Sequence, residues 1–176
     1  MITKETIEKK LSQYPIFEYA FLDTEELNFY PNVRTICSTE CPRYGKSWSC
    51  PPAVGTLEEC KERCLNYKNG LIFSTISEVN DLLDMGETLS KRKEHIEIVN
   101  AIKNDIFSEE NVLILTAESC DICEECAYPN EPCRHPEQMY PCIESQTIIV
   151  TEICENHHLS FYSGYNTITW FCLILF

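Results

Sequence analysis

Ten of the twelve cysteines in this chain fall into two compact groups, and each group holds enough thiols to bind a metal centre. The first group consists of Cys37, Cys41, Cys50, Cys60 and Cys64. The second group consists of Cys120, Cys123, Cys126, Cys133 and Cys142. Thiolates are soft, charged ligands, and four of them converging on one point need a cation to offset their repulsion. The sequence therefore predicts metal or iron–sulfur binding.

The second group begins with the run Cys120-x2-Cys123-x2-Cys126. A loop with this spacing wraps three thiolates around one corner of a cubane cluster, and the fourth ligand arrives from further along the chain. Cys133 is the nearest candidate for that position, and Cys142 is the next. Zinc needs only two close pairs of ligands, so the triple run favours a [4Fe–4S] cluster over zinc, which is the alternative.

The first group supplies three ligands from the run Cys37-x3-Cys41-x8-Cys50. Cys60, in the first turn of a predicted helix, is the candidate for the fourth ligand. Cys64 lies one turn further along the same helix face and is the alternate. An iron–sulfur cluster is again favoured over zinc. If the fourth position stays open, a substrate can coordinate one iron of a three-cysteine site.

Basic side chains surround the first group. Residues 31–70 carry six Lys or Arg against four Glu. Arg34, Arg43 and Lys46 flank the cysteines, and they can offset the charge of a cluster or recruit an anionic substrate or an acidic partner. These three residues are therefore predicted to contact the cofactor or its substrate.

Acidic side chains surround the second group. Residues 118–146 carry seven acids against one base, Arg134. Nearby negative charge disfavours the addition of an electron, so a cluster in this loop is predicted to have a low reduction potential. His135, in the run Cys133-Arg-His-Pro136, is a candidate for orienting a ligand or transferring a proton.

The whole chain carries a formal net charge of −14, which argues against general binding to nucleic acids or anionic membranes. The N-terminus lacks an apolar signal core, and the longest apolar run, 170–176, is too short to cross a bilayer. A cytoplasmic location is predicted, where thiols stay reduced, so a disulfide framework is disfavoured. Cys154 and Cys172 lie in apolar stretches and are predicted to be buried core thiols.

Hydrophobic spacing and capping patterns predict four helices and four strands. The helices are expected at 3–13, 56–68, 77–107 and 144–157, and the strands at 17–21, 71–73, 112–115 and 168–176. The alternation predicts one α/β layered domain over residues 1–176, with a mainly parallel or mixed four-stranded sheet and two long cysteine-rich loops, 31–55 and 120–141. If the first and third strands run parallel, both loops lie at the same edge of the sheet.

Two motifs resemble those of a known family. The run Cys41-Pro-Arg-Tyr-Gly-Lys-x-Trp-x-Cys50-Pro-Pro52, followed by Cys120-Asp-Ile-Cys123-Glu-Glu-Cys126-Ala-Tyr-Pro and Cys133-Arg-His-Pro136, resembles a prokaryotic family of predicted cysteine-rich metal-binding proteins, a domain of unknown function. The resemblance covers nearly the whole chain and implies metal binding, with iron–sulfur favoured, but no particular reaction. It implies that the ligands are Cys37, Cys41, Cys50, Cys60, Cys120, Cys123, Cys126 and Cys133.

Three functions remain open. The first is a cytosolic protein with two [4Fe–4S] clusters that passes single electrons to a redox partner enzyme. The second is an iron–sulfur enzyme, with at least one cluster, whose open iron site acts on a small anionic substrate. The third is a zinc-stabilised interaction module without a redox role.

Overall fold

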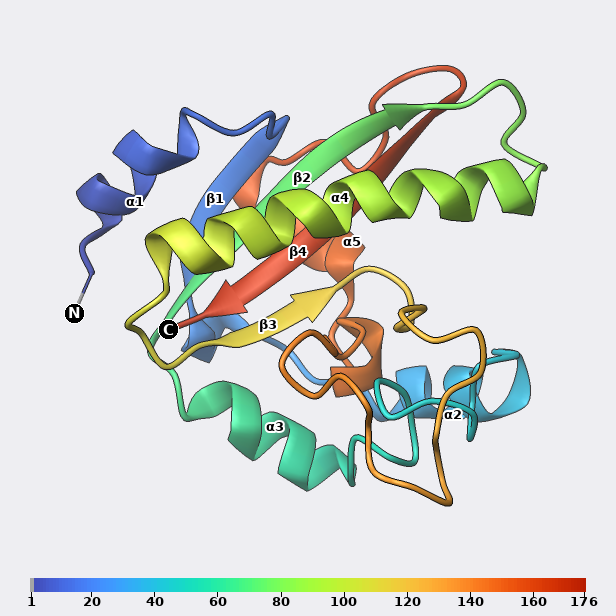
Figure 1. The fold of residues 1–176 in the computed structure, drawn as a ribbon. Coiled ribbons are helices and arrows are strands. Elements are labelled where there is room, and N and C mark those ends of the chain that lie inside the picture. Colours follow the sequence, from blue (N-terminus) through green and yellow to red (C-terminus); the bar gives the residue numbers. More distant parts are fainter. Residues whose placement is uncertain (1) are drawn as a thin grey trace.

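The four strands form one antiparallel sheet in a computed structural model that describes residues 2–176 (Figure 1). The strands are β1 (Glu18–Asp23), β2 (Asn69–Glu78), β3 (Leu113–Thr116) and β4 (Thr167–Leu175). They lie in the order β1-β2-β4-β3, and every neighbouring pair is antiparallel. The prediction of a mainly parallel or mixed sheet is therefore wrong, whereas the α/β composition and the four strands are confirmed.

The two central strands explain the error. β2 and β4 are neighbours in the sheet although a helix, β3 and a second helix separate them in the sequence. Ile72 and Phe73 of β2, and Leu173 and Ile174 of β4, are fully buried although they alternate between the two faces of the sheet. Continuous apolar runs are typical of parallel strands covered on both faces. Here helices cover both faces of an antiparallel pair, so the same apolar pattern results.

Five helices surround the sheet in the described part of the chain. They are α1 (Lys4–Leu11), α2 (Pro31–Thr39), α3 (Leu57–Leu65), α4 (Met85–Ile106) and α5 (Val150–His157). Figure 1 shows α4 crossing the front of the sheet, with α5 behind it. One hydrophobic cluster joins α1 and α4 to one face, and a second joins α3 and α5 to the other. No helix among residues 2–176 combines the length and the apolar character that a membrane crossing requires.

The segment 31–55 is not the wholly irregular loop that its prolines suggested, because it begins with α2. Pro31 occupies the first turn of this helix, where the missing N–H of proline costs no intrahelical hydrogen bond. The predicted helix 144–157 is also interrupted, since Thr147 has a left-handed backbone with φ of 65°. A short 3-10 turn, Glu144–Gln146, therefore precedes α5. The capping box predicted at the start of α3 is confirmed, because Thr56 and Glu59 exchange side-chain and backbone hydrogen bonds.

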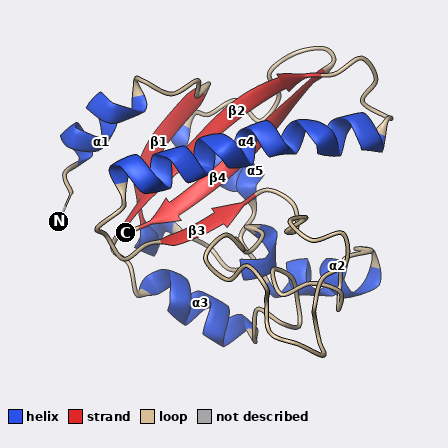
Figure 2. Cartoon of the chain, in the orientation of Figure 1, coloured by secondary structure: helices blue, strands red, loops and turns tan. Residues whose placement is uncertain are grey.

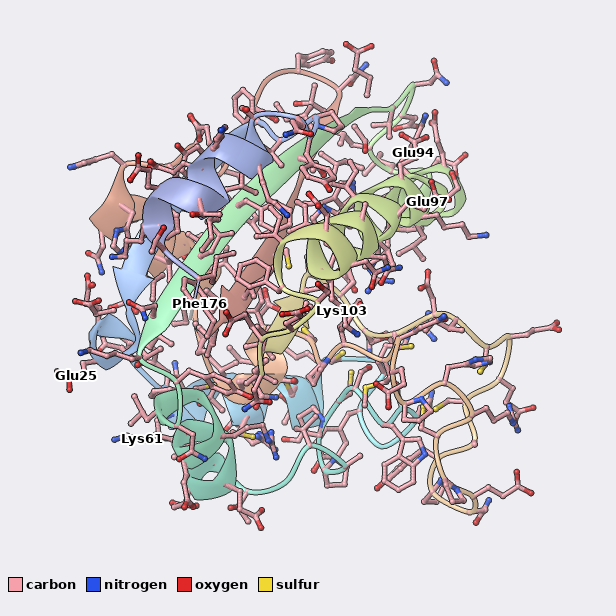
Figure 3. All side chains as sticks on the ribbon, turned by 60° about the vertical axis from the view of Figure 1, so that its left-hand side comes forward. Glu25, Lys61, Glu94, Glu97, Lys103 and Phe176 are labelled. Atoms are coloured by element: carbon pink, nitrogen blue, oxygen red, sulfur yellow. The ribbon has the colours of Figure 1, made fainter. Side chains whose placement is uncertain are left out.

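Both cysteine-rich segments lie in the loop-rich part of the molecule beside α2 (Figure 2). In the view of Figure 3, yellow sulfur atoms concentrate around these loops. β1 and β3 run in opposite directions, so the segments do not meet at a shared carboxyl edge. Tertiary contacts bring them together instead, including hydrogen bonds from Cys120 N to the Ser49 hydroxyl and from Trp48 Nε1 to the carbonyl of Glu131.

Candidate metal centres

Four of the five cysteines of the second group line one small cavity of about 20 Å³. Its walls include the four thiols that the sequence predicted as ligands, namely Cys120, Cys123, Cys126 and Cys133. His135 and Arg134 complete part of the same wall, so the predicted position of His135 beside the ligands agrees with the geometry. The donor set fits a thiolate-ligated metal centre, and we call this cavity the second site.

Hydrogen bonds at the second site favour the thiolate form of one cysteine. Burial raises the pKa of Cys126, but the backbone N–H groups of Tyr128 and Trp48 and the hydroxyl of Ser47 outweigh burial and leave that pKa below its usual value. Burial likewise raises the pKa of Cys120, and there it dominates. Because the thiolate is the form that binds a metal, the N–H donors around Cys126 prepare it as a ligand.

Aromatic and basic side chains fix the loop that carries the second site. Trp48 Nε1 donates to the backbone carbonyl of Glu131 at 3.1 Å, and its ring packs edge-on against Tyr128 with 5.0 Å between centroids. Arg134 donates to the carbonyl of Glu125 at 3.0 Å. Lys103, labelled in Figure 3, extends from α4 and donates to the carbonyl of Glu137 at 2.8 Å. The loop is therefore tied to α4 and to the segment that carries the first cysteine group.

Arg92 is a buried residue beside the second site that sequence reasoning missed. It is only 2 % exposed on α4, and its guanidinium donates to Asp121 Oδ1 at 2.6 Å and to the carbonyl of Ala117 at 3.0 Å. It holds the residue that follows Cys120, and its charge opposes the rise that burial causes in the pKa of that thiol. In the sequence it stands in a Lys-Arg-Lys run, 91–93, which carries no local sign of burial.

The first cysteine group lines a much larger cavity of about 510 Å³ between α2 and the start of α5. Three predicted ligands, Cys37, Cys41 and Cys50, lie in its walls. Cys142 joins them there, although the sequence placed it with the second group. Burial and then the charge of Cys41 raise the pKa of Cys37, so these thiols lie close enough to interact electrostatically. We call this cavity the first site.

Cys60, the predicted fourth ligand, is outside the walls of the first site. Its side chain is fully buried in α3, where its sulfur accepts hydrogen bonds from Arg34 at 3.4 Å and from Arg63 at 3.8 Å. Cys64, the alternate, is also fully buried, and burial raises its pKa to about 12. The structure thus brings three of the four predicted thiols together and supplies Cys142 in place of Cys60. The sequence named Cys142 only as an alternate ligand of the second group, and tertiary contacts place it at the first site instead.

The predicted basic residues of the first site have different surroundings. Arg43 lines the cavity. Arg34 donates to the carbonyls of Gly55 at 2.8 Å and Ser145 at 3.0 Å, so it holds α2 against neighbouring loops. Its charge also opposes the rise in the pKa of Cys37. Lys46 is absent from the walls of both sites.

Residues 47–50 connect the two sites. The Ser49 hydroxyl accepts a hydrogen bond from Cys120 N at 2.9 Å. The backbone carbonyl of Ser49 accepts a second hydrogen bond, from Cys142 N at 3.3 Å. The next residue, Cys50, lines the first site, whereas Ser47 lines the second. Both sites therefore share the wall formed by residues 47–50.

The described residues contain no set of three His, Cys, Asp or Glu side chains grouped so that it could hold a single metal ion. A tetrahedral zinc ion with Zn–S bonds of about 2.3 Å requires thiolates in near contact with one another. In a [4Fe–4S] cluster each thiolate binds a different iron, so the four sulfurs surround a larger object. Both kinds of centre use thiolate ligands, which both cavities offer.

A family model described as "Predicted metal-binding protein (DUF2284)" matches residues 20–176, which include every cysteine in the chain. No match was found among curated proteins or among solved structures.

Proposed function

The chain belongs to this family of predicted metal-binding proteins, and from that premise we propose that it holds two [4Fe–4S] clusters and serves in one-electron transfer to a partner protein. The observation that carries the proposal is the wall of residues 47–50 shared by two thiol-lined sites. Two neighbouring clusters supply and accept electrons one at a time. The density of free thiols suits a reducing compartment such as the cytoplasm.

At the second site the proposed ligands are the four predicted cysteines of that cavity, Cys120, Cys123, Cys126 and Cys133. Arg92 and Trp48 orient the loop, since one contacts Asp121 and the other contacts Glu131 and Tyr128. The carboxylates of the loop around this site disfavour the addition of an electron to the cluster, which supports the low reduction potential expected from the sequence.

At the first site the proposed ligands are Cys37, Cys41 and Cys50, with Cys142 in the fourth position. Cys142 Sγ lies 2.7 Å from Glu144 Oε2, and burial raises the pKa of both groups. Ligation would therefore require Cys142 to give up the hydrogen bond that its thiol donates to Glu144. Cys60 serves instead as a buried anchor for Arg34 and Arg63.

A second function has one specific observation in its favour. The first site is about 510 Å³, which is far larger than electron transfer alone requires and within the range of small-molecule pockets. If Cys142 stays bound to Glu144, the remaining three cysteines leave one iron open to a substrate. This alternative is an iron–sulfur enzyme.

Purification without oxygen tests the proposal. About eight irons and about eight acid-labile sulfides per chain, with a broad absorption near 400 nm that bleaches on reduction, would support two clusters. A colourless protein with stoichiometric zinc and no sulfide would overturn both iron–sulfur functions and leave a zinc-stabilised interaction module. Material purified in air should be analysed beside it, because a cluster lost to oxygen can be replaced by zinc.

A further inference from the structure

The first site has a wall that thiol ligation does not explain. Its larger apolar side chains include Val33, Ile36, Ile148, Ile149, Val150 and Phe161. They come from α2, from the start of α5 and from the loop that precedes β4. Phe161 is held in place by a stacked contact with Phe171, with 5.7 Å between ring centroids and 9° between planes. An aliphatic wall with one fixed aromatic ring excludes a hydrated ion and accepts an organic molecule.

The charged side chains of the same cavity disfavour an anion. Arg43 lines the cavity together with two carboxylates, Glu118 and Glu144. The two carboxylates outnumber the one guanidinium, and the ligating thiolates add further negative charge. Arg34 and Lys46, which suggested an anionic substrate in the sequence, are both absent from the cavity wall.

We propose that the first site binds a small, mainly apolar organic molecule that carries no negative charge. This inference rests on the proposed function, because metal ligation is what keeps the thiols negatively charged. It names a neutral ligand in place of the anionic substrate expected from the sequence. The proposed cluster occupies part of the cavity of about 510 Å³, and the molecule occupies the remaining space beside the apolar wall.

Two probes that share one ring system test the charge preference. N-phenyl-1-naphthylamine is neutral, and 8-anilinonaphthalene-1-sulfonate adds one negative charge to the same skeleton. Equilibrium dialysis of the anaerobically purified protein should show one neutral probe bound per chain, about tenfold or more tighter than the sulfonate. Equal affinities, tighter sulfonate binding or no neutral binding would overturn the inference.

Matched variants locate the binding. Ile36→Glu places a charge in the apolar wall, and Leu65→Glu places one on α3 outside the cavity. The two side chains are 50 % and 40 % exposed, so each substitution should be tolerated in the fold. Ile36→Glu should weaken neutral-probe binding by about tenfold, and Leu65→Glu should leave it unchanged. Equal losses in both variants would mean binding elsewhere on the surface and would overturn the assignment.

Glu118→Gln tests the role of charge separately. It removes one carboxylate from the wall and should tighten sulfonate binding severalfold while the neutral probe is unaffected. An unchanged ratio of the two affinities would contradict the electrostatic argument.

Iron and sulfide measured on the same samples separate this inference from the proposed function. If protein with about eight irons per chain does not bind the neutral probe, the inference is refuted and the proposal of two clusters is retained. If protein without iron binds the neutral probe in preference to the sulfonate, the proposal of two clusters is refuted and the apolar site is retained.

Discussion

The Ser49 hydroxyl accepts a hydrogen bond from the backbone N–H of Cys120 at 2.9 Å across 71 residues of chain. Ser49 is fully buried, and its hydroxyl also lies 2.9 Å from that of Ser47. One side chain therefore supports the walls of both candidate metal sites.

Replacing Ser49 should disturb both sites together. Ser49→Ala leaves the Cys120 N–H unsatisfied in a buried setting, so the free energy of unfolding should fall by about 1–3 kcal/mol. Urea unfolding measures this loss, and electron paramagnetic resonance of the reduced protein should show both cluster signals altered. Ser38→Ala, at an exposed hydroxyl bonded only to Thr35 O, is the control and should change stability by less than about 0.5 kcal/mol. An effect confined to one signal would contradict the shared wall.

Replacement of single cysteines should distinguish the two candidates for the fourth ligand of the first site. Cys142→Ser should reduce iron from about eight to about four per chain if the cluster needs four thiolates. Cys60→Ser should retain the iron, because that thiol contacts Arg34 and Arg63 rather than the cavity. Cys154→Ser controls for loss of a buried thiol that lines neither site. Iron loss in Cys60→Ser with full iron in Cys142→Ser would restore the ligand set expected from the sequence.

The half-buried ion pair at the second site should contribute to stability. Arg92→Met removes the partner of Asp121 and the donor to the carbonyl of Ala117, so the free energy of unfolding should fall by about 1–3 kcal/mol. The same variant should lose iron faster in the presence of a chelator, since the Cys120 loop is released from α4. Lys93→Met, at the exposed neighbouring position, should match the parent protein in both measurements. Equal behaviour of the two variants would rule out the tether.

His95 should make the fold sensitive to acid. Burial and the charge of Arg92 lower its pKa from 6.5 to about 3, and its Nδ1 lies 2.8 Å from the hydroxyl of Thr75. The unfolded chain binds a proton at this residue below pH 6.5, while the folded chain does not. The contribution of His95 to stability is therefore complete above pH 6.5 and declines by about 1.4 kcal/mol per pH unit as the pH falls toward 3.

Urea unfolding at pH 7, 6 and 5 measures this slope. His95→Gln keeps a hydrogen-bonding group for Thr75 but does not titrate, so its stability should fall less steeply over that interval. His158→Asn, at an exposed residue with a left-handed backbone, is the control and should keep the parent slope. Parallel slopes in the parent and His95→Gln would show that another group causes the acid sensitivity.

The sequence predicted those parts of the site that depend on local spacing. The four cysteines of the second site lie within one loop, so their convergence follows from the chain itself. The fourth thiol of the first site depends on a bridge between Thr116 and Cys142, which no local pattern encodes. Cys60 was the nearer candidate in the sequence, but α3 turns its side chain into the core.

The dependence on contacts between distant segments also explains the errors in the predicted fold. Hydrophobic runs identified all four strands, but apolar content does not reveal the direction of a strand that is buried on both faces. The proline content of 31–55 predicted a loop, whereas Pro31 at a first helical turn is compatible with α2. Composition therefore fixed which segments are buried, and pairing between distant segments decided how they are arranged.

The position of β4 has a consequence for synthesis of the protein. β4 pairs with both β2 and β3, and it follows all of the proposed ligands in the chain. A nascent chain that emerges from its N-terminal side exposes both sets of thiols before the centre of the sheet can form. Metal insertion during translation would thus act on unfolded thiols, where competing ions bind readily. Metal that is inserted after β4 has paired with β2 and β3 would instead bind at two folded sites. The order of folding and metal insertion would then influence which metal is bound.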